Sequence, residues 1–309
     1  MALVKKIIAM IGAVIDLGTN TFNLLIYKKQ GDDYTIIHSK RQAVSLGEGG
    51  MKTNIITPEA FKRGVATLVA FKQQCNQFDV TIIKAFGTSA LRGAINTYAF
   101  KAEVLQQTGI VINVISGEEE AQLIYEGVKN VHTFNYLSCI MDIGGGSTEF
   151  ILADEKGMLE LKSFNIGVAR MIQTFELSDP LSKEDILTLE HYLATTTQPF
   201  FETHSCKTLI GASGSFDTFY ELLFNTPYTE LWSSALLPQK ELLEKLDQLI
   251  HSSCFDREQD DRILDLRKNM IHIAALKTRW VIQQLHIEEV WVSPASLKEG
   301  VMFSKLDSL

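Results

Sequence analysis

The stretch IMDIGGGSTEF, residues 140–150, places two carboxylates, three consecutive glycines and two hydroxyls within eight residues. A run of glycines lets several backbone N–H groups point at one anion, because no Cβ atoms stand in the way. Ser147 and Thr148 add hydroxyl donors, and Asp142 follows an apolar run at a place where it can hold a divalent cation. The combination predicts a site for a phosphate group and its magnesium ion.

A second stretch resembles the first. VIDLGTNTFNLLIY, residues 14–27, aligns with IMDIGGGSTEFILA, residues 140–153, so that Asp16 matches Asp142 and Gly18 matches Gly144. Each copy is predicted to form a strand, a tight turn and a second strand, since short apolar runs flank a turn that a helix interior would not tolerate. This weak internal duplication indicates two related domains, each with a phosphate cradle.

The rest of the chain alternates between predicted strands and helices, which is typical of an α/β protein with two domains. Further strands are predicted at 34–39, 80–86, 110–116, 159–166, 207–212 and 289–293, and helices at 58–77, 96–107, 118–130, after Ser182, at 260–285 and at 297–306. The first domain is placed at 1–130 and the second at 131–296, and a C-terminal helix within 297–309 is expected to pack back on the first. A ligand is expected in a cleft between the two domains.

Composition limits the possible functions. The chain has 309 residues and a net charge of −8, which disfavours a generic nucleic-acid binder, although a locally positive site can still take a small anion. Four scattered cysteines without a CxxC pair argue against a zinc site and a disulfide framework. No apolar run reaches the roughly 18 residues of a membrane span. The protein is therefore expected in the cytoplasm, with no membrane or nucleic-acid partner.

Other phosphate-binding and catalytic motifs fit poorly. A Walker A loop needs a Gly-Lys pair, which the chain lacks, and a dinucleotide fingerprint must open a helix, whereas a strand follows Gly146. In ISGEEEAQ, the acids of a first helical turn suit the helix dipole, but one carboxylate could also take a proton from water. Periodicity alone does not choose among Glu118, Glu119 and Glu120.

Six blocks taken together resemble the exopolyphosphatase/guanosine pentaphosphate phosphatase (Ppx/GppA) family in its short two-domain form. They are VIDLGTNTFNLLIY, GTSALRGAIN, ISGEEEAQLIYEGV, MDIGGGSTEFIL, SFNIGVARM and VSPASLKEGVM, in the order of the family and across nearly the whole chain. The resemblance implies two duplicated actin/Hsp70/sugar-kinase-like (ribonuclease H-like) domains with an interdomain cleft. It also implies a homodimer that removes terminal phosphate from inorganic polyphosphate, or from guanosine pentaphosphate, with Mg²⁺.

The resemblance also assigns roles to residues. It selects Glu120 as the catalytic base and gives Glu149 a part in positioning water or metal. The expected metal carboxylates are Asp16, Asp142 and Glu149. The expected phosphate contacts come from three turns and one arginine: Gly18, Thr19, Asn20, Arg92, Gly144, Gly145, Gly146, Ser147, Thr148, Gly211, Ser213, Gly214 and Ser215.

Two positions depart from the family pattern. The third turn reads GASGS at 211–215 where the family usually has GTGGT, and Lys298 stands where an arginine is usual. Two other functions use the same fold. A nucleotide-binding switch of the actin/Hsp70 type would hold ATP in the same turns, and a sugar or acetate kinase would need an additional substrate site that the sequence does not reveal.

Overall fold

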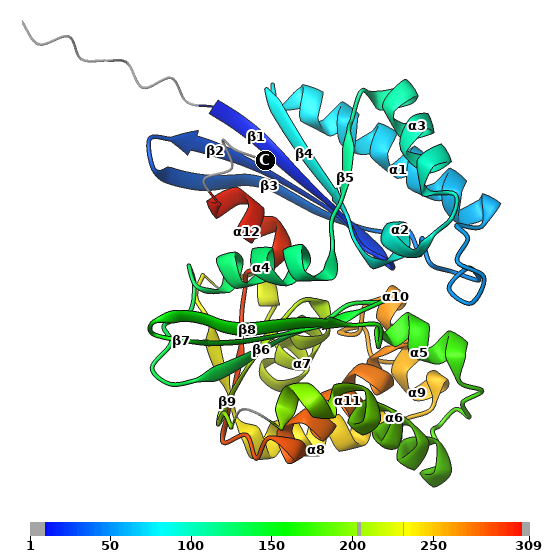
Figure 1. The fold of residues 1–309 in the computed structure, drawn as a ribbon, viewed down its shortest axis with the longest axis vertical. Helices are drawn as coiled ribbons and strands as arrows, with labels where there is room; N and C mark the ends of the chain where they lie inside the picture. Colours follow the sequence, from blue (N-terminus) through cyan, green and yellow to red (C-terminus); the bar gives the residue numbers. More distant parts are fainter. Residues whose placement is uncertain (1–9, 203–204, 231, 305–309) are drawn as a thin grey trace, which may run out of the picture. The chain divides into compact units, whose positions relative to one another are not determined.

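The computed structural model describes residues 10–202, 205–230 and 232–304. These residues form two compact units. Unit 1 comprises the chain up to Ser116 together with the residues from Val301 onward, and unit 2 comprises Gly117–Gly300. Each unit is built on one mixed sheet (Figure 1).

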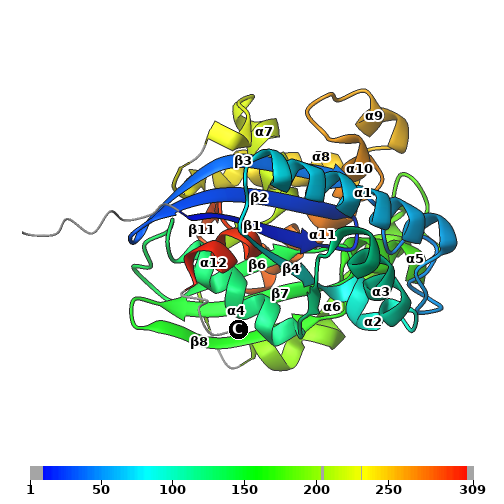
Figure 2. The same cartoon turned by 90° about the horizontal axis from the view of Figure 1, so that it is seen from above.

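Unit 1 contains a five-stranded sheet in the order β3-β2-β1-β4-β5. Strands β1 to β3 are antiparallel and lie side by side (Figure 2), whereas β4 and β5 continue the sheet in parallel to β1. The elements are β1 (Met10–Leu17), β2 (Thr21–Gln30), β3 (Asp33–Ala43), α1 (Pro58–Gln77), β4 (Ile82–Gly87), α2 (Ser89–Gly93), α3 (Thr97–Thr108) and β5 (Ile112–Val114).

Unit 2 contains a six-stranded sheet in the order β10-β11-β9-β6-β7-β8. Its strands are β6 (Ser138–Ile143), β7 (Thr148–Asp154), β8 (Gly157–Phe164), β9 (Thr208–Ala212), β10 (Ala235–Leu237) and β11 (Glu289–Val292). Its helices are α4 (Gly117–Val128), α5 (Val168–Thr174), α6 (Lys183–Phe201), α7 (Gly214–Phe224), α8 (Gln239–Ile250), α9 (Cys254–Glu258), α10 (Asp265–Lys268) and α11 (Ile271–Gln284), with a 3₁₀ turn η1 (Tyr228–Glu230). Helix α12 (Leu297–Phe303) starts in unit 2 and ends in unit 1.

The two sheets share one topology. Read from the outer antiparallel strand, the first is β3-β2-β1-β4-β5 and the second is β8-β7-β6-β9-β11, to which β10 adds a further edge. The aligned hairpins also share their register, because Asp16 pairs with Asn23 as Asp142 pairs with Glu149. The predicted α/β fold with a duplicated domain is confirmed.

Local signals in the sequence explain where the long helices begin. The hydroxyl of Thr57 accepts a hydrogen bond from the backbone of Ala60, and Pro58 occupies the first turn of α1, where its missing N–H is not needed. At α6, Ser182 and Asp185 form a complete capping box. Both starts agree with the sequence prediction.

Two boundaries differ from the sequence prediction. Helix α4, predicted as the end of the first domain, belongs to unit 2 because it packs on β7 and β8, so the division falls after Ser116 rather than near 130. The predicted continuous helix 260–285 is divided into α10 and α11. Residues 260–264 are not helical, and a turn at 269–270 separates α10 from α11, where the Arg257 side chain donates to the carbonyl oxygen of Lys268. The predicted last helix ends at Phe303, and residues 305–309 lie outside the described part of the chain.

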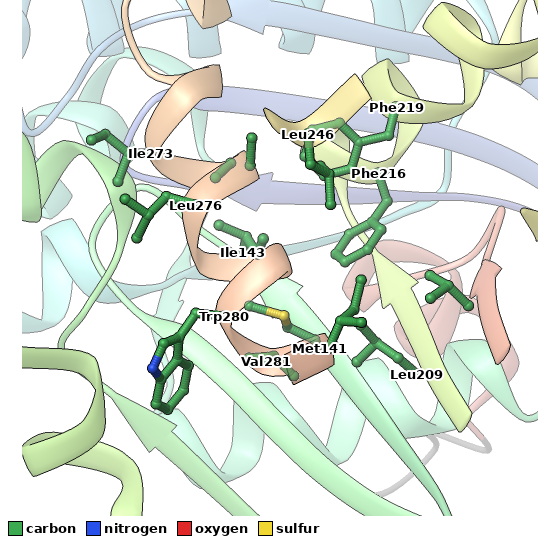
Figure 3. Close-up of a cluster of buried hydrophobic side chains, with 14 of the residues drawn as sticks. Met141, Ile143, Leu209, Phe216, Phe219, Leu246, Ile273, Leu276, Trp280 and Val281 are labelled. Atoms are coloured by element: carbon green, nitrogen blue, oxygen red, sulfur yellow. The ribbon is translucent and has the colours of Figure 1, made fainter. Parts of the chain in front are cut away.

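The core of unit 2 lies between its sheet and α11. Figure 3 shows Met141 and Ile143 of β6 pointing at this helix, among Leu276 and Trp280. Because side chains alternate along a strand, Asp142 points to the opposite face of the sheet. No helix among the described residues is long and apolar enough to span a membrane.

A buried histidine in this core makes stability depend on pH. His272 is 5% exposed, and its Nδ1 has no hydrogen-bond partner among the described residues. Burial, reinforced by the positive charge of Arg257, lowers the pKa of His272 to about 4, against the opposing effect of Asp179. Between pH 6.5 and 4 the unfolded chain therefore binds a proton that the folded chain does not, and stability falls as the pH falls through this window.

We expect acidification from pH 6.5 to 4 to remove up to about 3 kcal/mol through His272 alone. The urea midpoint of the wild type should therefore fall more steeply over this range than that of His272→Leu. The exposed His251, changed to Gln, serves as the control and should leave the wild-type slope intact. Equal slopes for the wild type and His272→Leu would contradict the prediction.

Candidate active site

The second glycine turn is held from one side by the start of α5. The carbonyl oxygens of Gly144, Gly145 and Gly146 accept hydrogen bonds from the backbone N–H groups of residues 168, 170 and 167, at 3.0, 3.0 and 3.3 Å. In a trans peptide the N–H points away from the preceding C=O. The N–H groups of residues 145, 146 and 147 therefore point away from α5, as an anion-binding turn requires.

Glycine is required here by close contacts. A Cβ on Gly144 would lie 3.0 Å from the carbonyl oxygen of Ser147, and one on Gly18 would lie 2.9 Å from the carbonyl oxygen of Thr21. The α5 side is tighter still, since a Cβ on Gly167 would come within 2.3 Å of the carbonyl carbon of Gly145. The glycines thus allow both the tight turn and the approach of α5.

Two carboxylates flank this turn, one on each strand of the hairpin. Asp142 and Glu149 are cross-strand partners on β6 and β7, and they are 8% and 1% exposed. The hydroxyl of Ser296 donates to Asp142 Oδ2 at 2.6 Å, and that of Ser163 donates to Glu149 Oε1 at 2.7 Å. Each carboxylate is therefore oriented by a serine. Sequence reasoning missed both serines, although each lies in a block that resembles the family.

The carboxylate pair fits magnesium. Among the described residues, no group of three His, Cys, Asp or Glu side chains forms a metal cage. Magnesium usually binds one or two carboxylates and completes its shell with water and substrate phosphates. Asp142 and Glu149 beside an anion-binding turn supply that donor set. Their role as metal ligands stays a prediction.

Of the three consecutive glutamates, the structure singles out one. Glu118 and Glu119 are exposed at the start of α4, whereas Glu120 is 9% exposed. Helix α4 packs on β7 and β8, the strands that carry Glu149 and Ser163. Glu120 is thus the buried member of the three, and its role as the base stays a prediction.

A buried lysine lies beneath the turn. Lys277 of α11 is 1% exposed, and its Nζ donates to the hydroxyl of Thr148 and to the carbonyl oxygen of Ile166, the latter at 2.6 Å. Burial lowers the pKa of Lys277 to about 7, although the negative charges of Glu149 and Asp142 oppose this shift.

The Thr148 side chain differs from the sequence expectation. Thr148 is fully buried, and its hydroxyl is bonded to Lys277 on the α11 side of the sheet. Because Glu149 is the next residue of β7, its side chain lies on the other face. The Thr148 hydroxyl is therefore part of the support beneath the turn rather than a phosphate donor.

The third predicted turn follows β9. Gly211 is the penultimate residue of this strand, Ser213 precedes α7, and Gly214 and Ser215 open that helix. A Cβ on Gly214 would lie 2.0 Å from Nη2 of Arg267, whose other nitrogen, Nη1, donates to the hydroxyl of Thr218 at 2.7 Å. A buried cation that the sequence did not reveal therefore lies against a predicted phosphate turn.

Unit 1 carries the remaining predicted site residues. Asp16 accepts a hydrogen bond from Asn23 at 3.0 Å, and the carbonyls of Thr19 and Asn20 accept from the segment that follows β3. Arg92 is half-buried, and its Nη1 donates to the carbonyl oxygen of Ile115 at 2.8 Å. Their roles toward metal and phosphate stay predictions.

Comparisons with known proteins identify the family. The model of the Ppx/GppA phosphatase family matches residues 25–309. The chain belongs to the Ppx/GppA phosphatase family, a family of phosphoanhydride hydrolases. The crystal structure of an exopolyphosphatase from Cytophaga hutchinsonii is 33% identical, with a TM-score of 0.92 over 97% of this chain and 99% of that one. The predicted family and its fold class are therefore confirmed.

Two more distant relatives widen the comparison. The Ppx/GppA enzyme of Aquifex aeolicus is 24% identical with a TM-score of 0.80, covers 96% of this chain and 100% of its own, and supports the fold alone. A guanosine-5'-triphosphate,3'-diphosphate pyrophosphatase of Aliivibrio fischeri is 29% identical over 96% of this chain. The chain spans only 59% of the length of that relative.

Ser213 is the position where the third turn departs from the family's glycine, and its backbone is strained. Its φ of 81° and ψ of 174° lie in a region used almost only by glycine. We expect Ser213→Gly to raise the free energy of unfolding by about 1 kcal/mol, because relief of strain exceeds the entropy cost of glycine.

Urea unfolding measures this effect. Ser215→Gly is the matched control, since Ser215 lies within the first turn of α7 and glycine there should cost about 0.5–1 kcal/mol. If Ser213→Gly loses as much stability as Ser215→Gly, the backbone of Ser213 is not strained.

Proposed function

We propose that this Ppx/GppA-family protein is an exopolyphosphatase, which releases the terminal phosphate of inorganic polyphosphate by attack of water. The observation that carries the proposal is the glycine turn, whose carbonyls are bonded to α5 so that the N–H groups of residues 145–147 point away from it, beside the buried Asp142–Glu149 pair. Phosphoryl transfer needs mainly positioning and charge neutralisation. This site offers N–H donors for the phosphoryl oxygens and carboxylates that would hold a neutralising magnesium ion.

The reaction can be written with the residues of this chain. The N–H groups of the glycine turn hold the oxygens of the terminal phosphoryl group, and Glu120 accepts a proton from a water molecule. The water oxygen bonds to the terminal phosphorus, and the bridging P–O bond breaks to leave a chain one phosphate shorter. Magnesium, held by Asp142 and Glu149, would neutralise charge on the phosphoryl oxygens.

Similarity favours polyphosphate as the substrate. The Cytophaga exopolyphosphatase is 33% identical over 97% of this chain, and the Aliivibrio guanosine-nucleotide enzyme is 29% identical over 96% of it. The 29% identity to that enzyme makes guanosine pentaphosphate the second candidate substrate. A nucleotide-binding switch of the same fold is the alternative of a different class, and it would bind ATP tightly without turning over either substrate.

Phosphate release from both substrates, side by side, tests the substrate and the metal together. We expect release from polyphosphate that stops with a chelator and returns with Mg²⁺, because the carboxylate pair is a hard oxygen donor set. Faster release from guanosine pentaphosphate would favour the second candidate. Tight ATP binding with no phosphate release from either substrate would favour the nucleotide-binding switch. Full activity in the presence of chelator would refute the requirement for a metal ion.

Changing the proposed base tests the mechanism. Glu120→Gln keeps the shape and hydrogen-bonding reach of the side chain but cannot accept a proton. We expect kcat to fall by about 10²–10⁴-fold with substrate affinity nearly unchanged. Glu118, which lies two residues earlier in the same helix and is exposed, provides the matched control, and Glu118→Gln should retain kcat. If Glu120→Gln retains turnover while Glu119→Gln or Glu149→Gln loses it, Glu120 is not the base.

A further inference from the structure

The buried Lys277 forms hydrogen bonds with two segments that are far from it in the sequence. Lys277 Nζ connects the first residue of β7, Thr148, with Ile166, in the link between β8 and α5. The glycine turn precedes Thr148 directly, and the start of α5 that holds the turn carbonyls follows Ile166 directly. One side chain therefore joins the two segments whose hydrogen bonds set the shape of the turn.

The position of Lys277 excludes direct contact with a substrate on the carboxylate face. Its bonding partner Thr148 pairs with Ile143, which points at α11, whereas Asp142 and Glu149 project from the opposite face. The lysine is 1% exposed and packed in the core of unit 2. An effect of Lys277 on catalysis must therefore pass through the backbone of β7 and the turn.

We propose that Lys277 is a positioning residue that clamps the glycine turn against the start of α5. The clamp keeps the N–H groups of the turn at fixed positions relative to the carboxylates of Asp142 and Glu149. The clamp does not depend on the protonation state, because a neutral amine still has two N–H donors for its two acceptors. This inference rests on the proposed function for its kinetic consequence, but the clamp itself is a property of the fold.

Hydrogen–deuterium exchange of the full-length protein, without substrate or metal, tests the clamp directly. We expect Lys277→Met to speed exchange about tenfold in peptides covering 143–149 and 164–168 and to leave the rest of unit 2 unchanged. Thr148→Val removes one acceptor only and should loosen 143–149 while 164–168 stays protected. The control is Thr278→Val, a neighbouring buried residue whose hydroxyl bonds within α11, to Ala274 at 2.9 Å, and it should change neither segment.

Kinetics separate positioning from simple stabilisation. With Mg²⁺ and polyphosphate, Lys277→Met should lower kcat about 100-fold, the cost of misplacing reacting groups by about 1 Å. The double variant Lys277→Met/Thr148→Val removes the lysine together with one of its two acceptors, so only the Ile166 carbonyl loses its donor. Its urea midpoint should therefore fall less than that of Lys277→Met, while kcat stays low. Lys277→Gln, which keeps a donor on a shorter side chain, should lie between.

The outcomes distinguish this inference from the proposed function. Wild-type protein that releases no phosphate would refute the proposed function and leave the exchange experiment as the test of the clamp. Exchange rates in both segments within twofold of the wild type in Lys277→Met, or a double variant with wild-type kcat, would overturn the inference. If Lys277→Met does not fold, the double variant and Thr148→Val carry the same test.

Discussion

The arrangement of unit 2 depends on two buried like charges. Asp142 and Glu149 are paired across neighbouring strands, where like charges repel, and water reaches neither freely. A serine hydroxyl donates to each carboxylate, and Lys277 interacts electrostatically with both from beneath the sheet. A site that already tolerates two buried anions through such contacts is also suited to a cation with its phosphate.

The duplicated hairpin of unit 1 shows how the same backbone can carry a different charge. Asn23 occupies in unit 1 the register position of Glu149, and its amide donates to Asp16. The first hairpin therefore holds one carboxylate, which accepts a hydrogen bond from a neutral amide, whereas the second holds two. The difference at this one register position gives the two hairpins different charges.

The sequence predicts what is local and misses what is distant. The hairpin around 142–149 is short, and glycines, alternation and duplication all indicate it; the register confirms the pairing. Ser296, Lys277 and Arg267 reach their partners across 154, 129 and 49 residues, and no periodicity encodes such contacts. Lys277 also lies in an apolar helix, where a single lysine gives no sign that it points inward.

Side chains along β7 alternate between the two faces of the sheet, and the two faces have different surroundings. Thr148 points into the core and is held by Lys277, and Glu149, the next residue, points to the chemical face. A slip of one residue in this strand would bury the carboxylate against α11 and present the threonine to the substrate. The tight glycine turn fixes the register from one end, and the lysine fixes it from below. The same bonds that stabilise the fold of unit 2 therefore determine which side chains lie on the face of the sheet that carries Asp142 and Glu149.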